Sequence, residues 1–183
     1  ENNLKEAKNN FPLFKLYKYD LTDYKKIKGL FLKEKPDVVF DLATIPLPTS
    51  LIKPYWSCDT MLKIILNLCE LLREGLYKTL IHLSSSEACG SALYIPMDET
   101  HPLMVKTPYA ACKASGDLLV RSYFCTFGLD VAIARPYNNY GPRQYPEKLI
   151  PFMTISAIEG KPLPLYGDGL NVRDWIHTRD HCR

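Results

Sequence analysis

Hydrophobic and polar residues alternate along the chain with two periods, one typical of strands and one typical of helices. Stretches rich in β-branched and aromatic residues predict strands at residues 13–20, 37–43, 79–84 and 130–135. Apolar positions at helical spacing predict helices at residues 22–35, 61–72, 109–127 and 150–159, after a polar, helix-like start at residues 1–10. Gly75 and Gly128 follow two of these helices, as expected of glycines that close helices. Alternation at this length predicts an α/β fold with a doubly wound, Rossmann-like parallel sheet.

The character of the sequence changes at residue 136. The stretch that follows is rich in loops, prolines and glycines, with one predicted helix and the turn-forming segment LPLYGDG. We therefore predict a domain boundary there, between residues 1–136 and residues 137–183.

Composition narrows the class of protein. The 183 residues are 46% hydrophobic and 23% charged, which is enough to bury a core. The net charge is +3 and the basic residues are scattered, so nothing in the charge pattern selects a nucleic acid or a membrane surface. No apolar run is long enough to span a bilayer or to act as a signal peptide. The six cysteines form no CxxC pair, which together with the missing signal peptide predicts a soluble, cytoplasmic protein. The histidines lack the spacing of metal ligands, so we predict no bound metal.

Polar clusters follow the predicted strands, at the edge where open α/β sheets place their ligands. One is the run SSSE at residues 84–87, and another is Tyr109 followed four residues later by Lys113 on one helix face. A phenol titrates near ~10 in water, and a neighbouring ammonium stabilises its phenolate. With a serine nearby, this group suits oxidation of a secondary alcohol by hydride transfer to a nicotinamide. The alternative is an aromatic residue packed beside a lysine whose aliphatic stem is buried.

A series of motifs gives these residues a context. The stretches YDLTD, PDVVFDLAT, HLSSSEACG, MDETHPL, TPYAACKASGD, ARPYNNYGPRQYPEKLIP and IEGKPLPLYGDGLNVRDW span nearly the whole chain. In this series the chain resembles the extended short-chain dehydrogenase/reductase superfamily, in its NAD-dependent nucleotide-sugar epimerase and dehydratase branch. The PEKLIP stretch most resembles the dTDP-glucose 4,6-dehydratases. The resemblance makes residues 1–136 an incomplete NAD-binding domain and residues 137–183 part of a nucleotide-sugar-binding region.

The resemblance implies a role for each matching residue. Ser85, Tyr109 and Lys113 match the catalytic serine, the base and the lysine that also contacts the nicotinamide ribose. Positions that match cofactor contacts are Asp20 and Leu21 at the adenine, Leu42, Ala43 and Thr44 beside the pyrophosphate, and Tyr137 at the nicotinamide. Positions that match the nucleotide-sugar site are Ser86, Asn138, Glu147, Lys148, Leu149, Pro164, Tyr166 and Arg173, of which Pro164 and Tyr166 lie beside the base and Arg173 at the diphosphate.

Glu87 bears on which reaction is implied. Within the family that the chain resembles, 4,6-dehydratases and UDP-glucuronate decarboxylases carry an acidic residue at the position of Glu87, whereas simple 4-epimerases usually do not. A carboxylate at this point removes the C5 proton after C4 is oxidised, which prepares loss of the C6 hydroxyl. Ser86 departs from the Asp of the dTDP-glucose enzymes, so the nucleotide stays open. UDP-sugar 4-epimerase and UDP-glucuronate decarboxylase remain alternatives, and Glu87 could instead only satisfy backbone amides at a helix start.

Other features depart from the family pattern. No GxxGxxG loop is present, so the chain reads as a middle fragment that we expect to be inactive alone, and a non-catalytic scaffold is the competing interpretation. The residue that would select NAD over NADP is missing. Asp41 stands where a histidine is frequent, and His82 is interpreted as a core histidine with its polar atoms satisfied. The resemblance also implies a homodimer through the helices at residues 55–73 and 109–127.

Overall fold

The structure, a computed structural model, describes residues 4–165 and 167–183. These residues divide into two compact units. One unit is Lys18–Arg135, and the other joins the described part of Glu1–Tyr17 to Pro136–Arg183.

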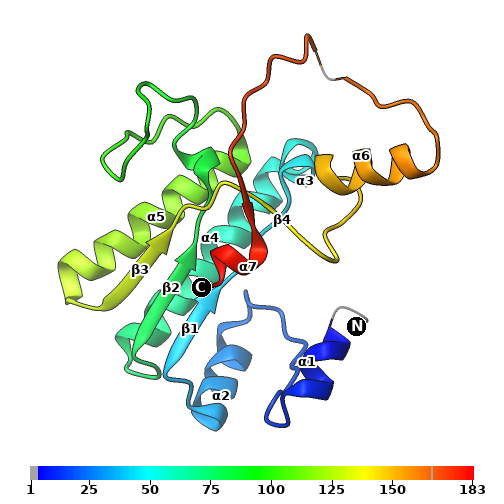
Figure 1. Cartoon of the computed structure of the whole chain (residues 1–183). Coiled ribbons are helices and arrows are strands. Elements are labelled where there is room, and N and C mark those ends of the chain that lie inside the picture. The colour runs from blue at the N-terminus through cyan, green and yellow to red at the C-terminus, as the bar shows by residue number, and fades with distance from the viewer. Residues whose placement is uncertain (1–3, 166) are drawn as a thin grey trace. The chain divides into compact units, whose positions relative to one another are not determined.

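The unit Lys18–Arg135 is built on a three-stranded parallel sheet. Its strands β1 (Val38–Asp41), β2 (Thr79–Leu83) and β3 (Asp130–Ala134) lie in the order β1-β2-β3 (Figure 1). Asp41 pairs in register with His82, and His82 with Ile133. The carboxyl ends of the three strands therefore meet at one edge of the sheet.

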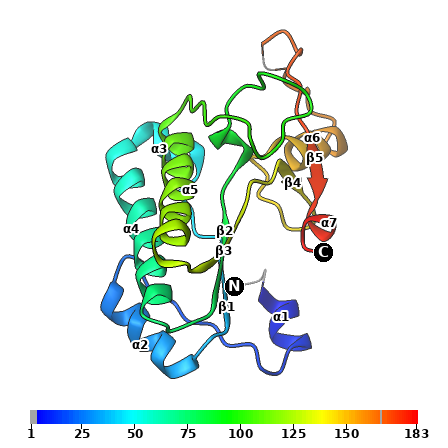
Figure 2. The same ribbon diagram turned by 90° about the vertical axis from the view of Figure 1, so that its left-hand side faces the viewer.

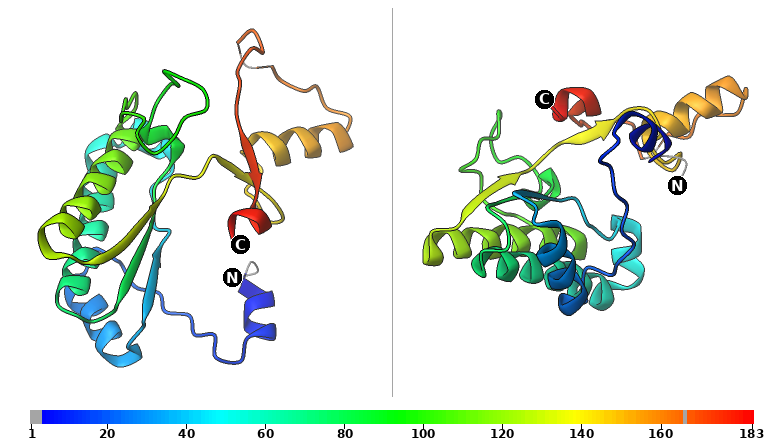
Figure 3. Two further views of the ribbon diagram at one scale, coloured as in Figure 1. Left: turned by 60° about the vertical axis from the view of Figure 1, so that its left-hand side comes forward. Right: turned by 90° about the horizontal axis from the view of Figure 1, so that it is seen from below.

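The connecting helices cover one face of this sheet. The unit contains α2 (Tyr24–Glu34), α3 (Leu47–Ile52), α4 (Pro54–Arg73), the 3-10 turn η2 (Ser86–Ala88) and α5 (Pro108–Phe127). Helices α4 and α5 lie side by side against the sheet (Figures 2 and 3), as right-handed crossovers between neighbouring parallel strands require. Both begin with a proline, and α5 ends at Gly128, whose φ of 67° favours glycine.

Strand periodicity separates a buried face of the sheet from an open one. Leu80 and His82 of β2 are almost fully buried under the helices, in contact with a core drawn mainly from α2, α4 and α5. On the opposite face, Val38 and Phe40 of β1 are 44% and 59% exposed. The main apolar core of this unit thus lies between the sheet and its helices.

The second unit is smaller and has a two-stranded sheet. Its elements are α1 (Lys5–Asn10), β4 (Asn138–Tyr140), α6 (Leu149–Ile158), β5 (Trp175–His177) and α7 (Thr178–His181). Strands β4 and β5 pair in parallel, and His181 is 2.7 Å from the side-chain oxygen of Asn139.

The alternating elements predicted for residues 22–135 are confirmed, and their ends differ by no more than two residues except that α4 begins seven residues before the helix predicted at 61–72. The strand predicted at residues 13–20 is wrong, because Phe14–Asp20 is irregular. Strand propensity needs a neighbouring ladder, and this segment joins neither described sheet. Helix α3 and the short strands β4 and β5 were not predicted, since their few residues carry no clear periodicity.

Candidate active site

The serine-rich run follows β2 directly and turns into η2. Ser85 caps this turn, with its Oγ accepting a hydrogen bond from the Glu87 backbone N–H at 3.2 Å. Ser84 is 7% exposed, and its Oγ has no hydrogen-bond partner among the described residues. Glu87 is exposed. The turn therefore presents a hydroxyl and a carboxylate at the carboxyl edge of the sheet.

Helix α5 brings a lysine to the same edge. Thr107 caps the helix and Pro108 begins it, so that Tyr109 lies in its first turn and Lys113 one turn later. Lys113 is 3% exposed, and its Nζ donates to the Leu83 carbonyl oxygen at 2.7 Å, two residues before Ser85. Helix α5 also packs against η2. The structure thus gathers the elements that carry Ser85, Glu87, Tyr109 and Lys113.

At Lys113 the effect of burial on the pKa is larger than that of the nearby charges. Burial lowers the pKa of Lys113, while the carboxylates of Asp41 and Asp117 oppose that shift. An ammonium deprived of water keeps its proton only when counter-charges lie close to it. The buried face of the sheet supplies two of them.

The residues expected at the cofactor's adenine and pyrophosphate lie near the sheet. Leu42, Ala43 and Thr44 follow β1 at its carboxyl end, where Leu42 is 67% exposed. Asp20 accepts hydrogen bonds from the backbone N–H and the hydroxyl of Thr22, which lower the pKa of its carboxyl. The Leu21 carbonyl accepts from Asn67 of α4 at 2.8 Å.

The residues expected to bind substrate lie mostly in the second unit and are largely exposed. The Asn138 amide donates to the Asp174 carbonyl, and Arg173 donates to its neighbour's carbonyl. Glu147 and Lys148 form an ion pair at 3.0 Å just before α6. Leu149 begins α6 and Ser86 lies in η2 of the other unit, whereas Tyr166 lies outside the described residues. Tyr137, expected at the nicotinamide of the cofactor, precedes β4.

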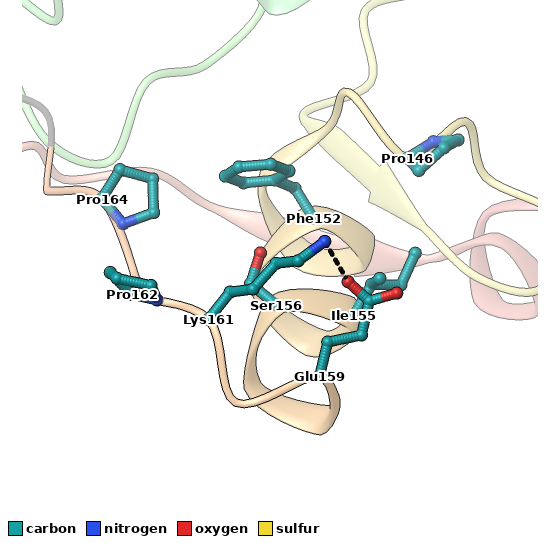
Figure 4. Close-up of a pocket in the computed structure, with 8 residues that line it drawn as sticks. All are labelled: Pro146, Phe152, Ile155, Ser156, Glu159, Lys161, Pro162 and Pro164. Carbon is teal, nitrogen blue, oxygen red and sulfur yellow. Dashed lines mark ion pairs between the residues drawn. The ribbon is translucent and has the colours of Figure 1, made fainter.

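A cavity of about 440 Å³ lies beside α6 in this second unit (Figure 4). Phe152, Ile155 and Ser156 come from the helix, and the prolines 162 and 164 come from the segment after it. Lys161 and Glu159 form an ion pair at 2.6 Å on its wall. Of the lining residues, sequence reasoning identified only Pro164. Phe152 was missed because a single aromatic residue in an apolar helix resembles core.

The described residues provide no sign of a metal site or of a membrane span. No group of three or more histidine, cysteine or acidic side chains in that part of the chain could hold a metal ion. Within the same residues no helix is both long enough and apolar enough to cross a bilayer. All six cysteines are free.

Comparison with known proteins identifies what the chain is similar to. The profile of the NAD dependent epimerase/dehydratase family matches residues 1–183. The dTDP-glucose 4,6-dehydratase of Haemophilus influenzae is 36% identical over 196 aligned positions, covering 98% of this chain and 56% of that protein.

Two solved structures agree with this match. The crystal structure of dTDP-glucose 4,6-dehydratase from Bacillus anthracis in complex with NAD has a TM-score of 0.88 and 36% identity, covering 100% of this chain and 56% of that one. The UDP-glucose 4-epimerase of Thermotoga maritima, solved with UDP-glucose, has a TM-score of 0.88 and 25% identity, and the match covers 96% of this chain and 59% of that one. The chain therefore spans a little over half the length of these proteins.

Proposed function

The chain belongs to the NAD dependent epimerase/dehydratase family, and on that premise we propose that the protein is an NAD-dependent nucleotide-sugar 4,6-dehydratase. The similarity to two dTDP-glucose 4,6-dehydratases at 36% identity supports this choice of reaction. A 4,6-dehydratase oxidises C4 of the sugar, eliminates water across C5 and C6, and returns the hydride to C6.

One observation carries the proposal: a carboxylate lies at the same edge of the sheet as Ser85, Tyr109 and Lys113, the residues assigned to the oxidation of C4. Glu87 lies in the turn that Ser85 caps, and this turn packs against the helix of Tyr109 and Lys113. Oxidation alone needs no carboxylate, whereas removal of the C5 proton needs a base. Glu87 is exposed at this edge, where a bound sugar could reach it.

The residues present fit the nicotinamide end of a dinucleotide. The Lys113 ammonium has three N–H bonds and gives one to the Leu83 carbonyl, which leaves donors for the ribose hydroxyls. Leu42, Ala43 and Thr44 offer backbone at the neighbouring strand end, where pyrophosphates bind in α/β sheets. The dinucleotide, when bound, takes up the hydride from C4 and later gives it back.

The side chains of this chain would move the protons. Tyr109, as a phenolate stabilised by the Lys113 ammonium, removes the C4 hydroxyl proton as the hydride leaves C4, with Ser85 sharing that proton. Glu87 then takes the C5 proton, whose acidity the new C4 ketone raises. The C6 hydroxyl then leaves as water, taking the proton that Glu87 has just removed from C5. Hydride addition at C6 and a proton from solvent at C5 complete the 4-keto-6-deoxy sugar, and Tyr109 releases the C4 hydroxyl proton to solvent.

The cavity beside α6 suits the nucleotide part of the substrate. Phe152 and Pro164 give it flat apolar surfaces on which a base can stack, and Ser156 adds a hydroxyl. We assign Arg173 to the diphosphate, because a guanidinium pairs with phosphate oxygens through two parallel hydrogen bonds. Asn138, Glu147, Lys148 and Leu149 would line the sugar.

A 4-epimerase is the second candidate, supported by the TM-score of 0.88 to the UDP-glucose 4-epimerase. Oxidation at C4 followed by hydride return to the other face needs Ser85, Tyr109 and Lys113 but no base at C5. Under that function Glu87 would have no chemical role.

We also propose a homodimer through α4 and α5. Leu66 of α4 and Leu118 and Phe124 of α5 are 38%, 56% and 55% exposed in the single chain, which leaves apolar surface for a partner. Light scattering of the purified protein should give twice the chain mass, and a monomer at micromolar concentration would contradict this assignment.

Product mass tests the function. The protein as its gene encodes it is incubated with NAD and, separately, with dTDP-glucose, UDP-glucose, UDP-glucuronate and GDP-mannose. Dehydration lowers the mass of the nucleotide sugar by one water, epimerisation leaves it unchanged, and decarboxylation removes carbon dioxide. A product of unchanged mass with every hexose would replace the dehydratase proposal by the epimerase.

A further inference from the structure

Four charged or titratable side chains lie together behind Lys113, on the helix-covered face of the sheet. Asp41 ends β1, His82 lies in β2, Asp117 lies in α5 and Arg135 follows β3. The first three are 4%, 0% and 2% exposed. Such groups are rarely buried unless they are paired.

Two hydrogen-bonded pairs face each other across the sheet. The Nδ1–H of His82 donates to the Asp41 carboxylate at 2.8 Å, and the Nε of Arg135 donates to Asp117 at 2.7 Å. Between them, His82 Nε2 and Asp117 Oδ1 lie 3.8 Å apart, and neither has a hydrogen-bond partner among the described residues. The prediction that the polar atoms of His82 are satisfied is therefore right for one ring nitrogen and wrong for the other.

The cluster adjoins Lys113 from two sides. Asp117 follows Lys113 by one helical turn, so both project from one face of α5. The carbonyl that accepts from Lys113 belongs to Leu83, the residue after His82. Cys69 of α4 and Tyr77 are further titratable groups near Asp41. Burial and Asp41 raise the pKa of the Cys69 thiol to about 12, and burial raises the pKa of the Tyr77 phenol, so both stay neutral.

Gly116 lets α5 approach this close to β2. A Cβ at residue 116 would lie 3.1 Å from His82 Nε2 and 2.5 Å from Ile65 Cδ1. A side chain at this position would crowd the imidazole that lies between the two carboxylates.

We propose that Asp41 and Asp117, which lie on either side of His82, are positioning residues that hold Lys113 as an ammonium directed at the end of β2. Arg135 fixes Asp117, and His82 fixes Asp41, so neither carboxylate can turn away. Burial is the largest influence on the pKa of Lys113 and lowers it, while Asp41 and Asp117 raise it and so keep it from falling further. Only the catalytic consequence rests on the proposed function, because the charge state of Lys113 is a property of the fold.

The direct test is the titration of Lys113 itself, by ¹⁵N NMR of lysine side chains in the native gene product, with the resonance assigned from Lys113→Met. We expect an ammonium signal at pH 7 in the wild type. In Asp117→Asn and in Asp41→Asn, which keep the shape of the side chain and remove its charge, the titration midpoint should move to lower pH. Asp59→Asn is the matched control, since Asp59 pairs with Lys63 near the surface of α4, and it should leave the midpoint unchanged.

Turnover gives the catalytic readout. Loss of one counter-charge should lower kcat about tenfold, a part of the ~10²–10⁴ that a positioned acid–base group contributes, with KM for the sugar nucleotide little changed. The alkaline limb of the kcat profile should move to lower pH together with the Lys113 midpoint. Asp117→Glu, which restores the charge, should recover most of the loss.

Each outcome decides one proposal. A neutral amine at pH 7 in the wild type overturns the positioning role without any variant, and so do unmoved midpoints in folded variants. If one variant does not fold, the other still carries the comparison, because the two carboxylates act from different elements. If the midpoints move but the wild type converts no tested sugar nucleotide, the positioning role stands and the dehydratase proposal fails.

Discussion

Replacing Glu87 by glutamine removes one carboxylate and leaves the geometry of its turn intact. The side chain is exposed, and the cap on η2 uses the Glu87 backbone N–H, which the substitution keeps. The free energy of unfolding should therefore change by less than about 0.5 kcal/mol, as at other surface positions. Loss of a positioned base slows its step by a factor of ~10²–10⁴, and at 1.36 kcal/mol per tenfold this adds about 3–5 kcal/mol to the barrier.

The assay follows both halves of the reaction with the sugar nucleotide that the wild type dehydrates. In Glu87→Gln, formation of the 4-keto-6-deoxy product should nearly stop, while oxidation at C4 continues and the absorbance of the reduced nicotinamide builds up. Glu99→Gln, an exposed glutamate in a loop, is the matched control and should behave as the wild type. Wild-type dehydration by Glu87→Gln would refute the role of this carboxylate.

Three further changes test other parts of the account. Tyr109→Phe should lower kcat by about 10²–10⁴ without moving the melting temperature, because only the phenol hydroxyl is lost; an active variant would exclude Tyr109 as the base. Leu71→Ala, at a fully buried core position, should cost about 2–5 kcal/mol in urea unfolding, and a cost under 1 kcal/mol would contradict the packing of α4. Hydrogen bonds from Arg73 and Tyr123 lower the pKa of Glu70 in the folded protein. The ionised Glu70 therefore stabilises the fold fully above its ordinary pKa of 4.5, and this stabilisation is lost as the pH falls. The difference in unfolding free energy between the wild type and Glu70→Gln should shrink on acidification, and a difference that grows would contradict this.

Much of the α/β unit could be predicted because its signals are local. Helix α5 has a threonine cap, a proline at its start and Gly128 at its end, and β2 is a short apolar run between turn signals. The strand predicted at residues 13–20 failed for a non-local reason, since hydrogen bonds to a neighbouring strand decide whether an apolar run becomes a strand.

The site shows the same division. The spacing of Tyr109 and Lys113 predicts a shared helix face, but not the hydrogen bond from Lys113 to Leu83, which depends on how α5 packs. The cluster of Asp41, His82 and Asp117 brings together residues 41 and 35 positions apart, so no short window of sequence contains it.

The position of solvent deuterium in the product tests the central claim most directly. If Glu87 removes the C5 proton and the proton returned to C5 exchanges with solvent, the 4-keto-6-deoxy sugar made in D₂O should carry one deuterium, at C5, by NMR. A product of unchanged mass without deuterium, formed by inversion at C4, would contradict the dehydratase account.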